Sequence, residues 1–128
     1  MNRKSAGHRT SLGKRGEEDA LRYLQHLGYI LLHQNLRLGR SEVDLVMNDH
    51  DEHVFVEVKT RSGPSDILPE ENIKTSQWKA LQRAADVYCR EQKNAFGVRF
   101  DIVAVTYHQN TRTLVHHKDV ILPMETVD

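Results

Sequence analysis

The sequence predicts an α/β fold in which helices pack on a mixed β-sheet. Three observations support this class: helical and strand-like segments alternate along the chain, apolar residues alternate within the strand-like segments, and the length suits one core. The chain has 128 residues, of which 38% are hydrophobic and 28% are charged. These values are typical of one globular domain, since a chain of this size forms one substantial core but not two.

The first half of the chain predicts one helix followed by three strands. In residues 11–29 the apolar side chains recur at helical spacing, and Gly28 is a typical helix end. Strands are expected at 29–37, 42–48 and 53–61, with LGRS and DHDE as the turns between them. The apolar stripe of this helix consists of Ala20, Leu21, Leu24 and Leu27 or Gly28.

The second half predicts a long helix and one or two further strands. The helix is expected at about 70–92, and the strands at 98–107 and, as an optional fifth, at 112–117. This order of elements is typical of an α/β or α+β domain with a mixed sheet of four or five strands. The core positions expected on the long helix are Ile73, Leu81, Ala84, Ala85 and Tyr88.

Composition and cysteine content predict a cytoplasmic protein. No apolar run approaches the ~18 residues that a membrane span needs, and none follows the basic N-terminus as in a signal peptide. The single cysteine, Cys89, excludes an internal disulfide and suits a reducing compartment. We divide the chain into a flexible basic arm (1–12), one domain (13–122) and a C-terminal tail (123–128). The basic N-terminal residues suit either contact with a phosphate backbone or a solvated terminus.

The strand-like segment VFVEVKTR contains a carboxylate and an ammonium where a buried strand is expected. Strand alternation places Val54, Val56 and Val58 on one face, and Phe55, Glu57 and Lys59 on the other. In the preceding strand, Val43, Leu45 and Met47 are expected to share one face, with Glu42, Asp44 and Val46 opposite. A symmetric turn pairs Asn48 with His53 and therefore places Asp44 across from Glu57.

Two opposed carboxylates can share one hard cation, which removes their mutual repulsion. Magnesium suits such a pair because it prefers oxygen ligands and retains bound waters that can attack a phosphorus atom. Lys59 lies on the face of Glu57 and can donate to a water or a transition-state oxygen. In the structural alternative, Lys59 simply forms an ion pair with Glu57 or Asp44.

The two helices each place one polar residue in their apolar stripe. Glu17 lies in line with Ala20, Leu21 and Leu24, whereas Glu18 falls on the solvent side. Gln77 lies in line with Ile73, Leu81 and Ala84 on the second helix. A carboxylate at the end of an apolar stripe needs a partner, so Glu17 either joins the acidic site or extends to solvent at the helix edge.

These segments resemble the YraN family of uncharacterised bacterial proteins. The likeness rests on GKRGEEDALRYLQHLGYILLHQNLR, SEVDLV, VFVEVKTR and VRFDIVAV, and extends from about Gly13 to Val105. That family is similar to the PD-(D/E)xK nuclease superfamily, whose Holliday-junction resolvases and restriction enzymes cut DNA with magnesium. The resemblance implies a restriction-endonuclease-like three-layer core. Because many junction-cutting enzymes of this fold work as dimers, it also makes a homodimer an option.

The resemblance also implies roles for individual residues. Asp44 and Glu57 correspond to metal ligands for Mg or Mn, together with the Val58 carbonyl, and Lys59 to the residue that positions or activates the attacking water. Glu17 corresponds to a further ligand, directly or through water. Gln77 stands where the family usually has lysine, which removes a positive charge from an expected phosphate contact. Val43 and Ser41 also depart from the usual residues, a superfamily proline and a family glycine.

Several basic residues are candidates for contact with a nucleic acid. Arg61, Arg37 and Arg40 lie near the acidic residues in the predicted strands, and Lys14 and Arg15 extend a basic surface, so all five are candidate nucleic-acid contacts. For each of them a solvated surface position is the alternative. We interpret Asp101 as a structural partner for an arginine, Trp78 and Cys89 as packing residues, and the histidines as unsuited to a zinc site.

The sequence therefore predicts a magnesium-dependent phosphodiesterase that acts on DNA or on a branched nucleic acid. The competing hypothesis is a non-catalytic nucleic-acid-binding or interaction module that retains the same fold. The net charge of zero and Gln77 favour the module, whereas the intact set of Asp44, Glu57 and Lys59 favours the enzyme.

Overall fold

The computed structural model describes residues 10–63, 75–92 and 97–120, and for residues 75–77 the backbone alone. The order of elements is the predicted one, and the optional fifth strand is present. The part of the expected arm that is described, residues 10–12, includes the start of the first helix. The elements are α2 (Ser11–His26), β1 (Ile30–Leu38), β2 (Ser41–Asp49), β3 (Glu52–Ser62), α3 (Thr75–Glu91), β4 (Gly97–His108) and β5 (Thr111–His117).

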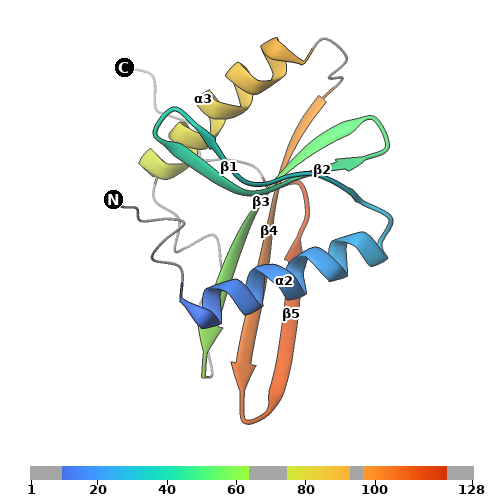
Figure 1. Ribbon diagram of the computed structural model, residues 1–128, viewed down its shortest axis with the longest axis vertical. Helices are drawn as coiled ribbons and strands as arrows, with labels where there is room; N and C mark the ends of the chain where they lie inside the picture. The colour runs from blue at the N-terminus through green and yellow to red at the C-terminus, as the bar shows by residue number, and fades with distance from the viewer. Residues whose placement is uncertain (1–9, 64–74, 93–96, 121–128) are drawn as a thin grey trace.

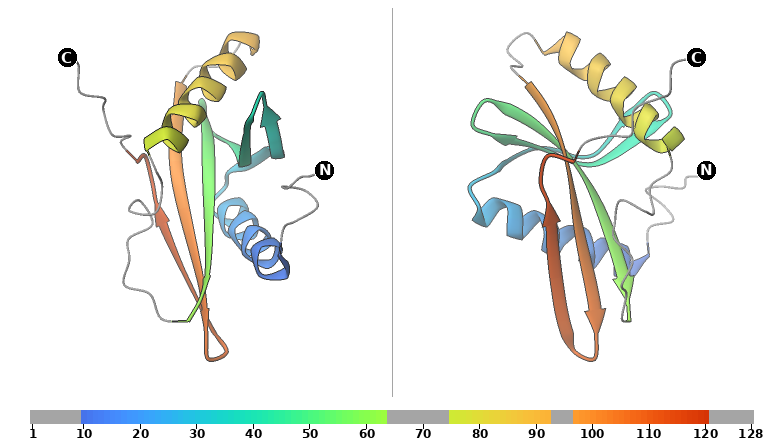
Figure 2. Two further views of the ribbon diagram at one scale, coloured as in Figure 1. Left: turned by 90° about the vertical axis from the view of Figure 1, so that its left-hand side faces the viewer. Right: turned by 180° about the vertical axis from the view of Figure 1, so that it is seen from behind.

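The five strands form one mixed sheet in the order β1-β2-β3-β4-β5. Only the pair β3 and β4 is parallel, and α3 lies in the connection between them, as a parallel pair requires a crossover. Figure 1 shows α2 crossing one face of the sheet, and Figure 2 shows α3 on the other side of β3 and β4. The protein is thus an α/β domain with a three-layer arrangement, which confirms the predicted fold class and is consistent with a restriction-endonuclease-like core.

The core is divided by the sheet into two apolar clusters. The first lies under α2 and contains Ala20 and Leu24 with Val54, Val56 and Val58 of β3. The second lies under α3 and combines Phe55 of β3 and Ile102 of β4 with the buried face of that helix. Four of the predicted core residues of α3 are buried, namely Leu81, Ala84, Ala85 and Tyr88. The fifth, Ile73, lies outside the described residues.

The end of α2 differs in one residue from the predicted apolar stripe. Leu27 was expected in the apolar stripe, but it is 52% exposed and caps the helix, so it does not belong to the core. The helix ends where Gly28 adopts a φ of 99°, the left-handed conformation that favours glycine, and this confirms the predicted helix end. Tyr29 then enters the α2-side cluster in place of Leu27.

The β2–β3 hairpin has the register that the symmetric turn predicted. Asn48 pairs with His53, and the chain reverses at His50, which has a φ of 59°. The prediction that Val43 shares the face of Leu45 and Met47 is wrong. Val43 packs under α3, while Leu45 and Met47 pack under α2. Strict alternation fails here because the paired residues of β2 and β3 end at Leu45 and Val56, and β2 continues beside β1 alone.

Candidate active site

Several element ends lie on one side of the molecule. The first turns of α2 and α3 and the β1–β2 turn all lie at the left of Figure 1, and at the right when the molecule is seen from behind in Figure 2. Asp44 follows the β1–β2 turn along β2, and Glu57 and Lys59 lie in the second half of β3. Asp44 is thus close in the chain to the β1–β2 turn, and Glu57 is the central residue of β3.

Asp44 lies at the point where β2 leaves β3. Its Oδ2 accepts a hydrogen bond from the backbone N–H of Val58 at 2.8 Å. The last backbone pair of this ladder is Leu45 with Val56, so the Asp44 side chain bonds to β3 just beyond the end of the backbone pairing. Because that N–H belongs to the peptide between Glu57 and Val58, the Asp44 carboxylate lies against the backbone of Glu57. The predicted pairing of Asp44 with Glu57 is not part of the ladder, and the Asp44 carboxylate bonds instead to the N–H that follows Glu57.

Glu57 and Lys59 form an ion pair on β3. The Nζ of Lys59 lies 3.6 Å from Oε2 of Glu57, and the two side chains are only 25% and 14% exposed. Partial burial makes such a pair more significant than an exposed one, because less water screens the charges. The pair is the contact that the structural alternative expected. It also holds an ammonium beside the acidic residues, as the catalytic hypothesis requires.

Glu17 is brought toward the sheet by α2 and contacts a residue that sequence reasoning missed. Its Oε1 accepts a hydrogen bond from Nδ2 of Asn35 in β1 at 3.3 Å. Asn35 has a φ of 53°, a left-handed conformation that is uncommon for a residue with a side chain. An asparagine within a strand-like segment was the available signal, because asparagine is depleted in strands.

Asn35 also connects Glu17 to Asp44. The neighbours of Asn35, Gln34 and Leu36, pair with Leu45 and Val43, which are the neighbours of Asp44. Asn35 and Asp44 therefore face each other across the β1–β2 ladder at the point where β2 turns away from β3. Asn35, with its left-handed backbone, and Asp44, which bonds to β3, thus lie at the same place in the sheet. We call this place the kink.

The oxygen atoms at this kink suit a magnesium or manganese ion better than zinc. Asp44 and Glu57 carry carboxylates and Val58 carries a backbone carbonyl, which are oxygen donors of the kind that Mg²⁺ prefers. Within the residues described, no group of three or more His, Cys, Asp or Glu side chains is placed to hold a metal ion. Magnesium is compatible with this arrangement, since it is commonly bound by one or two carboxylates and completes its shell with water.

The basic residues predicted near the site are placed differently from one another. Arg37 is exposed, and its Nη1 lies 3.7 Å from Oε1 of Glu42. Arg40, in the β1–β2 turn, and Lys14 are exposed, whereas Arg61 is half-buried. Arg15 is also exposed and lies over the ring of Tyr107. The side chain of Gln77 and the basic residues Arg3, Lys4 and Arg9 lie outside the described part of the chain.

Asp101 is a structural residue, as predicted. Its carboxylate accepts hydrogen bonds from Nε of Arg99 at 3.0 Å and from the N–H of Asp119 at 2.9 Å, and it lies 2.8 Å from Nε2 of His116. Arg99 further donates to Asp49 and to Tyr29. This buried network ties β4 to β5 and to the β2–β3 turn. Trp78 is buried in the α3-side cluster, which agrees with its interpretation as a packing residue.

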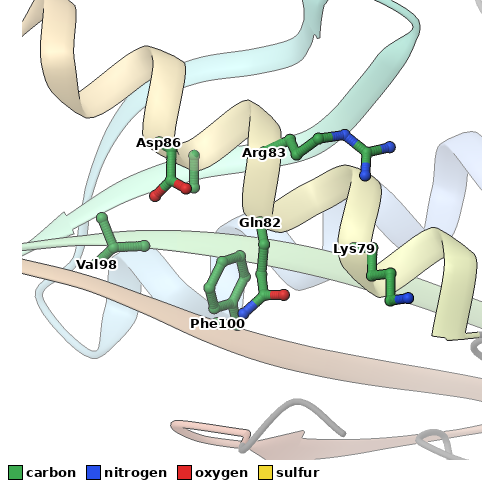
Figure 3. A pocket seen from close by; sticks show the side chains of 7 residues that line it. Lys79, Gln82, Arg83, Asp86, Val98 and Phe100 are labelled. Atoms are coloured by element: carbon green, nitrogen blue, oxygen red, sulfur yellow. The ribbon is translucent and has the colours of Figure 1, made fainter. Parts of the chain in front are cut away.

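A separate hollow lies between α3 and β4. Figure 3 shows Lys79 and Arg83 at one end, Asp86 and Val98 at the other, and Phe100 beside Gln82 between them. None of the described residues that line this hollow belongs to the predicted acidic site. We therefore place the candidate site at the β2–β3 separation and not in this hollow.

The fold and the site define a class: an α/β domain with a restriction-endonuclease-like layer arrangement and an acidic kink in its sheet. Comparison with known proteins then identifies the family. The model of the family described as "Uncharacterised protein family UPF0102" matches residues 16–105. The chain belongs to this family. This finding confirms the YraN-like resemblance. The matched segment includes Glu17, Asn35, Asp44, Glu57 and Lys59.

Individual relatives cover nearly the whole chain. A UPF0102 protein of Bacteroides thetaiotaomicron is 39% identical over 112 residues, which are 88% of this chain and 93% of the relative. One from Lawsonia intracellularis is 34% identical over 118 residues, covering 91% and 89%. One from Caldicellulosiruptor saccharolyticus is 37% identical over 99 residues, covering 77% and 84%. In the part of the chain that is described, no helix is both long enough and apolar enough to span a membrane.

Proposed function

We propose that this protein is a metal-dependent phosphodiester hydrolase of the endonuclease type, acting on DNA or on a branched nucleic acid in the cytoplasm. The observation that carries the proposal is the hydrogen bond between Asp44 and the Val58 N–H. It holds one carboxylate against the backbone of Glu57, beside the Glu57–Lys59 ion pair. Three charged side chains, Asp44, Glu57 and Lys59, thus lie close together along the chain near the end of the β2–β3 ladder.

The acidic residues would hold a magnesium or manganese ion. Asp44 and Glu57 are its carboxylate ligands, the Val58 carbonyl is a third oxygen, and Glu17 contributes directly or through water. The ion supplies Lewis-acid stabilisation of the charge that develops on a phosphate oxygen. The Val58 N–H fixes one oxygen of Asp44, so this side chain keeps its orientation. Fixed ligands reduce the reorganisation that the reaction would otherwise require.

Lys59 acts on the attacking water. Its ammonium group lies within ion-pair distance of Glu57, which holds the long side chain at the site. An ammonium in this position donates a hydrogen bond that orients a water molecule and stabilises negative charge on the phosphate. Half-burial of Lys59 strengthens the effect, since the surrounding protein screens the charge less than water does.

Substrate contacts come from the surrounding basic residues. Arg61 continues along β3 beyond Lys59 and contacts the phosphate of the cleaved strand, while Arg37 and Arg40 extend the contact along the β1–β2 turn. Lys14 and Arg15 add contacts from the first turns of α2, and Gln77 from α3. Their role is to position the phosphate backbone and not to read sequence.

Asn35 is a positioning residue in this proposal. Its amide holds the Glu17 carboxylate, and its left-handed backbone produces the bend opposite Asp44. Asparagine suits both tasks, because it tolerates this backbone conformation better than most residues with side chains. Glu17 and Asp44 would therefore reach the metal from two elements that Asn35 links.

A non-catalytic nucleic-acid-binding module is the second candidate. The Glu57–Lys59 ion pair favours it, because the pair neutralises the carboxylate without a metal ion. The net charge of zero agrees with the other form of this alternative, an interaction module of the same fold that does not depend on strong attraction to a polyanion.

One cleavage assay separates the two candidates. Labelled duplex, single-stranded, four-way-junction and structured-RNA substrates are incubated with Mg²⁺ or Mn²⁺ and with wild type, Glu57→Gln or Glu18→Gln. Glu18 is exposed on α2 and serves as the matched control, since the substitution removes the same charge. Metal-dependent cleavage that is lost in Glu57→Gln and kept in Glu18→Gln supports the hydrolase. Binding without cleavage, unaffected by metal and by Glu57→Gln, supports the module.

A further inference from the structure

Two arginines contact one buried carboxylate on the α2 side of the sheet, and a third lies over the tyrosine that donates to it. Asp19 of α2 accepts hydrogen bonds from the Tyr107 hydroxyl and, at 2.8 Å, from Nη2 of Arg22. The Nη1 of Arg112, in β5, lies 3.3 Å from the same carboxylate. The guanidinium of Arg15 lies 4.2 Å from the centre of the Tyr107 ring. We call Arg15, Arg22 and Arg112 the arginine cluster.

The arginine cluster presents positive charge to solvent, whereas its carboxylate does not. The side chains of Arg22 and Arg112 are 70% and 56% exposed, but that of Asp19 is 6% exposed. Three guanidinium groups against the carboxylates of Asp19 and of the exposed Glu18, which lies between Arg15 and Arg22 on the same helix, leave a net charge of about +1 on this surface. Each guanidinium has five N–H donors, and the contacts of Arg22 and Arg112 with Asp19 occupy few of them, which leaves donors for another acceptor.

Asp19 and Tyr107 organise these arginines. Burial would raise the pKa of Asp19, but the hydrogen bonds from Tyr107 and Arg22 outweigh it and lower the pKa. Burial and the hydrogen bond to Asp19 raise the pKa of Tyr107 to about 12, so its hydroxyl remains a donor at neutral pH. The ionised carboxylate therefore holds Arg22 and Arg112 near each other despite their repulsion. Arginines that are already ordered lose less conformational entropy when they bind an anion.

Two arginines of the cluster, Arg15 and Arg22, lie on α2, the helix that carries Glu17. Arg15 is two residues before Glu17, and Arg112 pairs with Tyr107 in the β4–β5 ladder. Figure 1 shows α2 crossing in front of the β4–β5 hairpin that carries these two residues. Arg15 and Arg22 are seven positions apart, or about 10 Å along the helix. Duplex DNA carries one charge per about 1.7 Å of its axis, so several phosphates fall within that length.

We propose that the arginine cluster binds the phosphate backbone of a nucleic acid, as a contact surface on the α2 side of the sheet that extends along α2 from Glu17. This inference rests on the proposed function and deepens it, because it assigns binding to Arg22 and Arg112 beyond the site itself. The partner is recognised through its phosphates and independently of sequence. The surface suits a duplex or branched substrate that extends past the cleaved bond.

The test measures binding separately from cleavage. Anisotropy of a labelled duplex and of a four-way junction is recorded in EDTA at several KCl concentrations, with the full chain carrying Glu57→Gln. Arg22→Ala, Arg112→Ala and the double variant are compared with Arg90→Ala, the matched control, since Arg90 is an exposed arginine near the end of α3. Far-UV circular dichroism and thermal midpoints verify that each variant is folded.

Each lost phosphate contact should lower the slope of log K against log [salt] by about 0.9 for duplex DNA. The affinity of a single variant should therefore fall about eightfold less than that of wild type for each tenfold rise in salt, and the double variant should lose roughly twice that slope. Arg112→Lys should retain most of the slope, whereas Arg90→Ala should not change it. Slopes for Arg22→Ala and Arg112→Ala equal to the control overturn the inference alone.

The remaining outcomes separate the inference from the proposed function. Reduced slopes in the cluster variants, together with a wild type that binds but never cleaves, keep the inference and overturn the hydrolase. A wild type that binds neither nucleic acid overturns both, and the cluster then serves a different anionic partner, such as an acidic protein.

Discussion

Gly16 of α2 lies directly against Thr60 of β3. A Cβ atom at position 16 would fall 2.8 Å from Cγ2 of Thr60, 3.0 Å from its Cβ and closer still to its Oγ1. Gly16 precedes Glu17 and Thr60 follows Lys59, so this contact sets how closely the helix carries Glu17 past the strand that bears the ion pair. The second glycine of GKRGE is therefore required by close approach of the backbone.

Gly16→Ala should destabilise the protein although alanine favours helices. The helical preference of alanine over glycine is about 1 kcal/mol, whereas overpacking a tight contact costs about 1–3 kcal/mol. We expect a lower free energy of unfolding in urea and, if the protein cleaves nucleic acid, a lower rate. Thr60→Ala in the same chain should recover part of the loss, because it removes the two nearest side-chain atoms. A Gly16→Ala variant as stable as wild type would contradict the steric role.

Asp44 should tolerate replacement by asparagine in stability but not in activity. Asp44→Asn keeps an oxygen that can accept the Val58 N–H, so we expect the free energy of unfolding to change by less than about 1 kcal/mol. Asp44→Ala leaves that N–H without its acceptor and should cost about 1–3 kcal/mol. Urea unfolding measures both changes, and metal-dependent cleavage should be lost in each variant. Equal stability of the two variants would show that the hydrogen bond contributes little.

Two substitutions of Asn35 should distinguish the role of its left-handed backbone from the role of its side-chain amide. Asn35→Gly keeps access to a φ of 53° and loses only the amide that holds Glu17. Asn35→Ala loses both, and its left-handed conformation costs about 1 kcal/mol more. We expect Asn35→Gly to be more stable than Asn35→Ala in thermal unfolding and to require more Mg²⁺ for half-maximal cleavage than wild type. Unchanged Mg²⁺ dependence would exclude the positioning role of Asn35.

The Asp101 network should make stability depend on acid pH. Burial would raise the pKa of Asp101, but hydrogen bonds from His116 and Arg99 outweigh it and hold the pKa below the ordinary value of 3.8. As the pH falls, Asp101 therefore becomes protonated at a higher pH in the unfolded chain than in the folded protein. The stability that Asp101 contributes is complete above pH 3.8 and is lost as the pH falls through the folded-state pKa.

Asp101→Asn tests this sign directly. The variant leaves the buried Arg99 without its charged partner on β4, so we expect about 3 kcal/mol lower stability at pH 7. Urea unfolding from pH 7 to pH 2 should show the difference from wild type shrinking below pH 4. A constant difference across this range would mean that Asp101 does not carry the predicted dependence.

Sequence patterns were sufficient for the elements and for the hairpin register. The period of apolar residues predicted α2 and all five strands, and the symmetric turn predicted the pair Asn48–His53. Both signals are local, because they depend on residues close together in the chain. The interpretation of Asp101 as an arginine partner was also confirmed, since a carboxylate in a buried strand requires a positive charge nearby.

Only the tertiary structure decided how the strands separate and what the helices carry to them. Val43 turned toward α3, Leu27 remained at the surface, and Asn35 became the link between Glu17 and the bend opposite Asp44. Each outcome depends on contacts between segments that are distant in sequence. A period of two or of 3.6 residues describes a regular element, but it contains no information about where a neighbouring strand ends or which side chain of another element fills the gap.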